Sequence, residues 1–401
     1  MEKAVRFVLV LWIGLVQLSC TRRVGVEPIS TISPSPVPSL SATASKVSPM
    51  PFIDTSHENI VMETPFGIYL VYDIDEQRSY EVTLPAVDCV FARRLWIAIC
   101  QTNNGLVSVD IQTGLQTALP IPPVRGWELT TGERSLFYNV DMGDVEFQGE
   151  IIGDIYELYR FDLKRNTIED LGPLNTTEGL GELALSNLGG HLASVRGIGE
   201  SHRASELYEI MPDGTYQRIG PDLVLTVEEL TWSPTDEILG ITASDLFYDE
   251  SLSDQGPNCT TTRFITYRWS TQEVRQVSQA PIDTCFQYTY HTSSNIWSPD
   301  GRRVVLKLIP PYGQTEDEEL CVVEIDSASQ RCLAVVLPEE WITQVAWSPD
   351  SLSLAYLVAN RSSRYVDLRM ISADGGTQTV LLANILGVWE ITGLVWIGAR
   401  R

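Results

Sequence analysis

Three segments of the chain are rich in carboxylates and contain no lysine or arginine. They span residues 141–155, 245–262 and 309–319. Their acids are Asp141, Asp144, Glu146, Glu150, Asp154, Asp245, Asp249, Glu250, Asp254, Glu316, Asp317, Glu318 and Glu319. The aromatic residues within or near them are Phe147, Phe247, Tyr248, Tyr288, Tyr290 and Tyr312. Carboxylates beside aromatic rings are suited to bind a basic protein or peptide, a cationic ligand or Ca²⁺.

A solvated acidic surface that only aids solubility is the alternative interpretation of the same segments. The whole chain is acidic, with 28 basic and 52 acidic residues and a net charge of −24. Such a charge repels phosphate backbones, so nucleic acid is excluded as a partner. The sequence does not indicate an oligomeric state.

Motifs of catalysis are missing from the sequence. It has neither the Gly-x-Ser-x-Gly nucleophile elbow nor the His-Glu-x-x-His zinc motif, and its four histidines are scattered. Asp73 and Asp75 form an Asp-x-Asp pair without the glycine of a calcium loop. We therefore predict no catalytic residue, no metal site and no cofactor, with Ca²⁺ left open. Because carboxylates far apart in sequence can meet in space, a carbohydrate- or peptide-active enzyme is the alternative to a binding role.

The cysteines indicate disulfides rather than metal or thiol chemistry. Apart from Cys20 there are six, and none forms a Cys-x-x-Cys pair. Hairpins turning at residues 93–94 and 326–327 would place Cys89 opposite Cys100 and Cys321 opposite Cys332. The remaining two, Cys259 and Cys285, are left as a third pair.

The first 56 residues predict export and attachment. An apolar run from Phe7 to Leu18 is too short to span a bilayer but suits a signal peptide at 1–19. Ser19-Cys20 resembles the processing site of bacterial lipoproteins, which implies that Cys20 is lipidated and anchors the chain to the cell membrane. An ordinary cleaved signal and an uncleaved anchor are the alternatives, and all three place the protein outside the cytoplasm. Residues 20–56, rich in Pro, Ser and Thr, are predicted to be a disordered tether.

Residues 57–401 are predicted to form one all-β domain because a phrase recurs in them. Trp-Ser-Pro stands at 232–234, 297–299 and 347–349, each followed by a turn and an apolar run. The Ser-to-Ser steps are 65 and 50 residues, a period typical of propellers. Ser-Pro-Asp-Gly at 298–301 has the residue preferences of a type I turn. Trp232, Trp297, Trp347 and the similarly placed Trp396 are predicted to be core residues.

The Trp-Ser-Pro-Asp-Gly units resemble the propeller repeats of TolB and its relatives, which are also seen in prolyl oligopeptidases. The resemblance covers residues 184–360 and implies an extracytoplasmic propeller used for binding. It carries over no partner, because fold does not determine function.

Counting repeats predicts a seven-bladed β-propeller of four-stranded antiparallel blades. Six blades are expected near 87–120, 127–172, 183–220, 229–278, 294–337 and 344–383. The seventh combines strands from 59–84 with a C-terminal strand around Trp396 and closes the ring. Six or eight blades stay open, because the first two units are faint.

The predicted ring has two different faces. Within a blade, the turns from first to second and from third to fourth strand share one face, and the other connections share the opposite face. The acidic segments and the Cys259–Cys285 pair fall on this second face. We therefore predict a non-catalytic binding or scaffold module. Its expected binding residues are Asp249, Glu250, Asp254, Tyr288, Tyr290, Tyr312, Glu316, Asp317 and Glu318.

Overall fold

The computed structural model describes residues 56–399 with gaps. The gaps are 65–66, 87–88, 94, 123, 125–126, 131–132, 148–149, 176–179, 188–189, 199–203, 212–214, 224–225, 246–260, 279–284, 287–295, 310–317, 338, 361, 363–364, 387–390 and 392. The predicted signal peptide at 1–19, Cys20 and the predicted tether up to residue 55 therefore lie outside the described residues. The described residues contain no helix that is long and apolar enough to cross a membrane.

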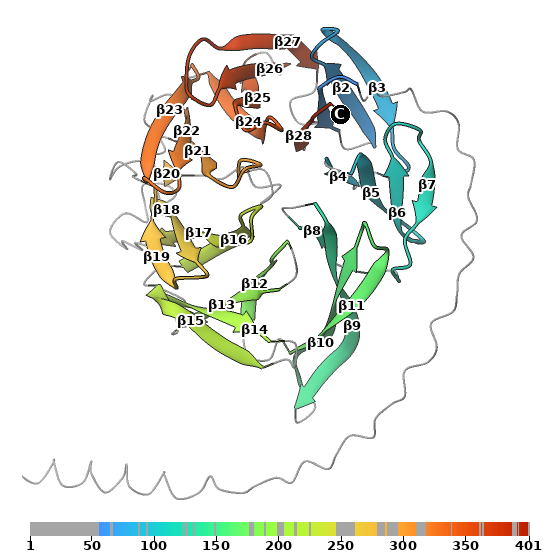
Figure 1. Ribbon diagram of the computed structural model, residues 1–401, viewed down its shortest axis with the longest axis vertical. Helices are drawn as coiled ribbons and strands as arrows, with labels where there is room; N and C mark the ends of the chain where they lie inside the picture. The colour runs from blue at the N-terminus through green and yellow to red at the C-terminus, as the bar shows by residue number, and fades with distance from the viewer. Residues whose placement is uncertain are drawn as a thin grey trace, which may run out of the picture. The chain divides into compact units, whose positions relative to one another are not determined.

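The described chain forms seven four-stranded antiparallel sheets arranged in a ring, which confirms the predicted seven-bladed propeller (Figure 1). Blade 1 holds β4 (Cys89–Ala92), β5 (Ile97–Thr102), β6 (Gly105–Asp110) and β7 (Gln116–Ala118). Blade 2 holds β8 (Trp127–Leu129), β9 (Ser135–Phe147), β10 (Glu150–Asp162) and β11 (Thr167–Asn175). Blade 3 holds β12 (Leu180–Leu185), β13 (Leu192–Ile198), β14 (Ala204–Ile210) and β15 (Tyr216–Leu223).

The next three blades follow the same order. Blade 4 holds β16 (Thr226–Trp232), β17 (Ile238–Asp245), β18 (Thr261–Arg268) and β19 (Glu273–Gln276). Blade 5 holds β20 (Cys285–Phe286), β21 (Arg303–Ile309), β22 (Glu319–Glu324) and β23 (Ser329–Val335). Blade 6 holds β24 (Glu340–Trp347), β25 (Ser353–Asn360), β26 (Tyr365–Ser372) and β27 (Thr379–Leu386).

The seventh sheet, which we call the closing blade, joins the two ends of the domain. Its order is β28-β1-β2-β3, from β28 (Gly393–Ile397), β1 (Asn59–Glu63), β2 (Ile68–Asp73) and β3 (Arg78–Thr83). Trp396 lies opposite Ile60 and Val395 opposite Val61 in an antiparallel ladder. The ring is thus closed by a C-terminal strand paired with an N-terminal one, as the sequence predicted.

Tight turns between the first two strands of a blade share one conformation. In Ser298–Gly301, the N–H of Gly301 donates to the carbonyl of Ser298 at 2.8 Å, with a φ of 71° at Gly301. The same bond and a left-handed residue recur where the glycine is missing, at Asp236 (φ 59°) and Ser351 (φ 65°). The left-handed conformation costs these residues little conformational energy, because their side chains are short and polar.

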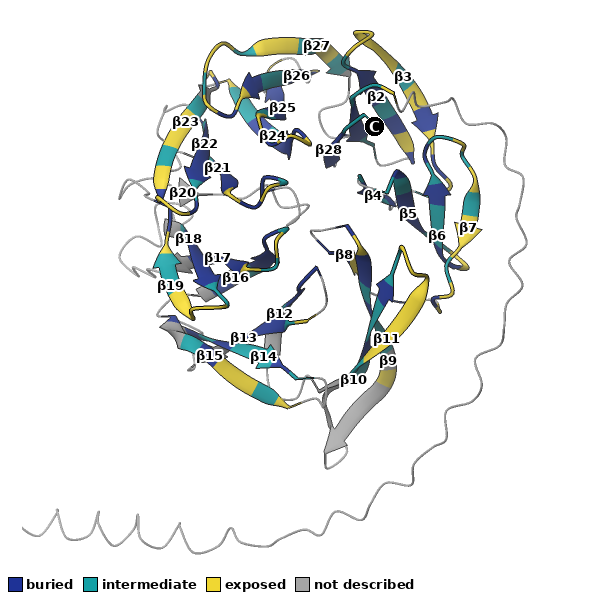
Figure 2. Cartoon of the chain, viewed as in Figure 1, coloured by how far each residue is buried: buried dark blue, intermediate teal, exposed yellow. Residues whose placement is uncertain are grey.

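Side chains from neighbouring blades fill the spaces between sheets. The four repeat tryptophans Trp232, Trp297, Trp347 and Trp396 are at most 3% exposed. Figure 2 shows buried residues on the inner strands and exposed ones mainly on outermost strands such as β3, β7 and β27. Apolar burial between blades therefore holds the ring together.

Two details of the predicted blades are wrong. Residues 141–155 were expected as a loop, but they continue β9 and β10 as a long hairpin. The β-branched residues of this segment favour extended backbone despite its acids. The inner strand of blade 5 begins earlier than the expected residue 294. Cys285 and Phe286 pair with one end of β21, and Trp297 bridges Val304 at the other end.

Candidate functional site

The two faces of the ring differ in the contacts between neighbouring blades. On the turn face, defined by the turns after the first and third strands of each blade, contacts run from blade to blade. Arg93 of blade 1 pairs with Glu133 of blade 2, and Asn187 of blade 3 donates to the carbonyl of Ser233 in blade 4 at 2.8 Å. Arg303 of blade 5 donates to the Ser351 carbonyl of blade 6 at 2.6 Å. These contacts hold neighbouring turns of the turn face in place.

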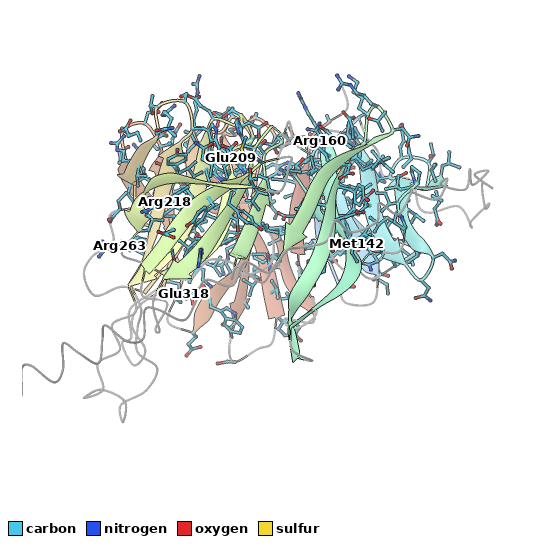
Figure 3. The ribbon with its side chains drawn as sticks, turned by 90° about the horizontal axis from the view of Figure 1, so that it is seen from below. Met142, Arg160, Glu209, Arg218, Arg263 and Glu318 are labelled. Carbon is cyan, nitrogen blue, oxygen red and sulfur yellow. A yellow bond between two sulfur atoms is a disulfide. The ribbon has the colours of Figure 1, made fainter. Side chains whose placement is uncertain are left out.

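The opposite face, which we call the loop face, carries the connections after the second and fourth strands. The edge-on view of Figure 3 places Arg160 and Glu209 toward the turn face and Glu318 toward the loop face, where the β9–β10 hairpin also ends. The same strand order places the end of β17 and the start of β18, and the end of β21 and the start of β22, on the loop face. The described strand ends that flank the acidic segments therefore share this face.

The β9–β10 hairpin extends beyond its neighbours. Strand β8 pairs with β9 only at Leu136–Tyr138, and β11 pairs with β10 only from Ile155 onward. We call the parts of the two strands beyond these contacts, residues 139–147 and 150–154, the hairpin arm. Among the described strands, none pairs with the outer edges of the arm. Its backbone donors and acceptors therefore face outward on both sides.

Acidic residues recur along both strands of the arm. In the backbone register Asp144 is the partner of Asp154, and nearer the tip Glu146 is the partner of Ile151 and Glu150 the partner of Phe147. The sequence therefore places four acidic residues within one short hairpin.

Glu318, at the base of the acidic segment before β22, ties blade 5 to blade 6. Its Oε2 accepts the N–H of Ile342 at 2.8 Å and lies 3.6 Å from Nζ of Lys307. Lys307 donates to the carbonyl of Ile342 at 2.7 Å. Burial lowers the pKa of Lys307, while the nearby Glu318 carboxylate opposes that shift. Glu318 is 9% exposed, so its contacts are interior ones.

The other expected binding residues lie outside the described residues. They are Asp249, Glu250, Asp254, Tyr288, Tyr290, Tyr312, Glu316 and Asp317. Cys259 also lies outside the described residues, and only the backbone of Cys285 is described, so their bridge stays a prediction. The other two predicted disulfides are confirmed: Cys89–Cys100 and Cys321–Cys332 join directly opposed residues of adjacent strands. Such bonds are typical of oxidising compartments.

Two polar clusters escaped the sequence analysis. Arg369 in β26 makes two bonds to the carboxylate of Glu340 in β24, at 2.8 and 3.2 Å. Beside it, burial raises the pKa of Tyr356 to about 12. The second cluster joins His57 to Asp73 and Asp75 in the closing blade. The partners are 16 residues apart in the histidine cluster and 29 apart in the arginine cluster, so no local sequence pattern predicts either contact. The Asp-x-Asp pair was the one sequence signal for the histidine cluster.

A small cavity of about 10 Å³, the space of one water molecule, lies between strands of blades 2, 3 and 4. It is lined by Glu128, Thr130, Phe137, Ala184, Leu185, Leu230, Thr231 and Trp232. Glu128 is the only carboxylate in this lining. Acid–base hydrolysis of a glycoside uses two carboxyl groups, so this cavity by itself lacks one of them.

Comparison with known proteins agrees with the fold and goes no further. No protein-family model matches the chain, and no curated protein matches it in sequence. Among solved structures, an oligogalacturonate lyase in complex with manganese is similar over 83% of this chain and 84% of its own, with 13% identity and a TM-score of 0.50. A Synechocystis apocarotenoid oxygenase mutant is similar over 89% and 95%, with 8% identity and a TM-score of 0.53. The Pyrococcus horikoshii acylaminoacyl peptidase is similar over 78% of this chain and 47% of its own, with 11% identity and a TM-score of 0.50.

Proposed function

We propose that this protein is a lipid-anchored extracytoplasmic propeller of the TolB-repeat type that binds a basic protein or peptide on its loop face without catalysis. The observation that carries the proposal is the hairpin arm, in which Asp144 and Asp154 are backbone register partners and no described strand pairs with either outer edge. A basic extended segment would pair with an open edge through its backbone and with the carboxylates through its side chains.

The position of the arm fits such a role. It projects on the same face as Glu318 and the ends of the acidic connections, whereas the turn face is occupied by blade-to-blade contacts. A partner held on the loop face would leave the ring itself undisturbed. The signal at 1–19, Cys20 and the tether at 20–56 would present this face outside the cytoplasm.

The test compares two triple variants of equal charge. One carries Asp144→Lys, Glu146→Lys and Glu150→Lys in the arm, and the control carries Glu81→Lys, Glu169→Lys and Glu273→Lys on outer strands. The probe is an extended lysine-rich peptide, and its affinity is measured by calorimetry at low and high salt. We expect the arm variant to lose at least tenfold in affinity and the control to lose less than threefold. Equal losses of affinity in the two variants would mean that only net charge matters for peptide binding, and would overturn the proposal that the arm is the binding site.

The alternative is a propeller enzyme that uses rim or channel carboxylates on carbohydrate or peptide. Of the described cavities, the one between blades 2, 3 and 4 contributes Glu128 alone. A Glu128→Gln variant of such an enzyme would lose turnover of its substrate, whereas a binding module would keep its peptide affinity.

A further inference from the structure

Three metal-ligating side chains converge at the edge of the closing blade. His57 precedes β1, Asp73 ends β2, and Asp75 lies in the turn between β2 and β3. One ligand atom from each lies within 4.8 Å of the other two. Nδ1 of His57 is 3.1 Å from Oδ2 of Asp73, and Oδ2 of Asp75 accepts the N–H of Glu58 at 3.3 Å. The three side chains thus come from two segments of chain that the fold brings together.

The turns between the third and fourth strands of blades 1 and 2 allow a comparison with the turn that holds Asp73 and Asp75. Asp110 accepts the N–H of Thr113 at 2.8 Å, and Asp162 accepts the N–H of Arg165 at 2.7 Å. Asp73 makes the same turn bond, to Glu76 at 2.9 Å, through Oδ1. A turn aspartate is therefore an ordinary part of these hairpins. Only in the closing blade do an imidazole and a second carboxylate join it within metal-ligand distance among the described residues.

The burial of Asp73 is the second observation. Its residue is 0% exposed, whereas Asp110 and Asp162 are partly exposed. Among the described residues no lysine or arginine forms an ion pair with Asp73 or Asp75, and the one side chain that Asp73 contacts in this way is His57. A buried carboxylate is normally compensated by a cation or a metal. Here a second carboxylate, that of Asp75, stands beside the same imidazole.

We propose that His57, Asp73 and Asp75 bind a divalent transition metal, with Zn²⁺ as the representative ion. One imidazole nitrogen and two carboxylate oxygens are a zinc-type donor set with room for a further ligand from solvent. The nitrogen donor disfavours Ca²⁺, which takes oxygen ligands and more of them. The metal would join the residue before β1 to the end of β2, and so fasten the N-terminal strands of the blade that closes the ring. This inference is independent of the loop face.

The test uses the full chain, treated with a chelator and then titrated with Zn²⁺, Mn²⁺ or Ca²⁺ at pH 7.5. We expect one Zn²⁺ site and a rise in Tm with added Zn²⁺, since a ligand of the folded state stabilises it. His57→Gln and Asp75→Asn should each weaken Zn²⁺ binding at least tenfold and abolish the rise in Tm. His57→Gln also removes the one side chain paired with the buried Asp73, so each variant is compared with itself, with and without Zn²⁺, rather than with the metal-free wild type.

The matched controls are His191→Gln, which changes a histidine paired with Glu209, and Asp162→Asn, which changes the corresponding turn of blade 2. Both should bind Zn²⁺ as the wild type does. Zn²⁺ binding that survives His57→Gln and Asp75→Asn would place the ion elsewhere and overturn the proposal. Absence of Zn²⁺ binding below millimolar concentration would overturn it too, and would leave a plain His57–Asp73 hydrogen bond.

Discussion

The three repeat tryptophans occupy equivalent positions but are bonded differently. Nε1 of Trp232 donates to the carbonyl of Ala184 at 2.9 Å, and Nε1 of Trp347 donates to the carbonyl of Ile296 at 3.0 Å. Each bond joins an inner strand to the blade before it. Nε1 of Trp297 has no acceptor in the described chain, and its ring packs over Gly240, where an added Cβ would come within 3.0 Å of Trp297 Cζ2.

Replacing each tryptophan by phenylalanine should therefore have unequal effects. Trp232→Phe and Trp347→Phe each lose packing and one buried hydrogen bond. Trp297→Phe loses packing alone and removes an unsatisfied N–H, which costs about 1–3 kcal/mol when buried. We expect the free energy of unfolding, measured by urea titration with circular dichroism, to fall on the order of 1–3 kcal/mol less for Trp297→Phe than for the other two. A larger loss at Trp297 would show that a buried water accepts from its Nε1.

At the scale of strands and turns, the sequence predicted what short-range patterns encode. Trp-Ser-Pro marks the turn after the first strand of blades 4, 5 and 6, and cysteines placed symmetrically about turn residues predicted two disulfides. The hairpin arm was not predicted, because acidic residues are on average depleted in strands. Residues 141–147 form a strand there through their pairing with β10, which a local pattern does not reveal.

The candidate site was predictable only in its composition. Acids at 141–155 and 316–319 could be counted, and the strand order predicted that both segments lie on one face. That Glu318 turns inward could not be foreseen, because its partner Ile342 belongs to the next blade. His57 likewise meets Asp73 only because the chain before β1 lies beside the end of β2. Contacts between residues that are far apart in the chain have no local signature in the sequence.

The two disulfides differ in access, which predicts their order of reduction. Cys89 and Cys100 are 4% and 0% exposed, whereas Cys332 lies exposed on the outer strand β23. Because thiol–disulfide exchange requires access to sulfur, Cys321–Cys332 should open first in dithiothreitol. Each bridge spans 11 residues, so losing one should lower the free energy of unfolding by up to about 3 kcal/mol.

Timed alkylation followed by peptide mass analysis measures this order. A variant with Cys321→Ala and Cys332→Ala should show, of these two reduction steps, only the slower one, that of Cys89–Cys100. Faster labelling of Cys89 and Cys100 than of Cys321 and Cys332 would mean that blade 1 opens locally before blade 5.

At the scale of the whole molecule, stability depends on closure of the ring. Strand β28 supplies Leu394, Trp396 and Ile397, all at most 3% exposed, and covers one edge of β1. Nε1 of Trp396 donates to the carboxylate of Glu58 at 3.1 Å, which joins the two ends of the domain directly. Without β28, the buried residues Ile60 and Met62 lose their partners and β1 becomes an open edge.

Truncation after residue 392 should therefore do more than remove one strand. We expect the truncated chain to form larger assemblies than the full chain in size-exclusion chromatography with light scattering, because the freed edge of β1 can pair with another molecule. Removal of residues 400–401 alone is the control and should change neither size nor Tm. A synthetic peptide of residues 391–401 should restore the original size by adding back the missing strand. A truncated chain that keeps the size and Tm of the full chain would show that six blades hold the ring without the last strand.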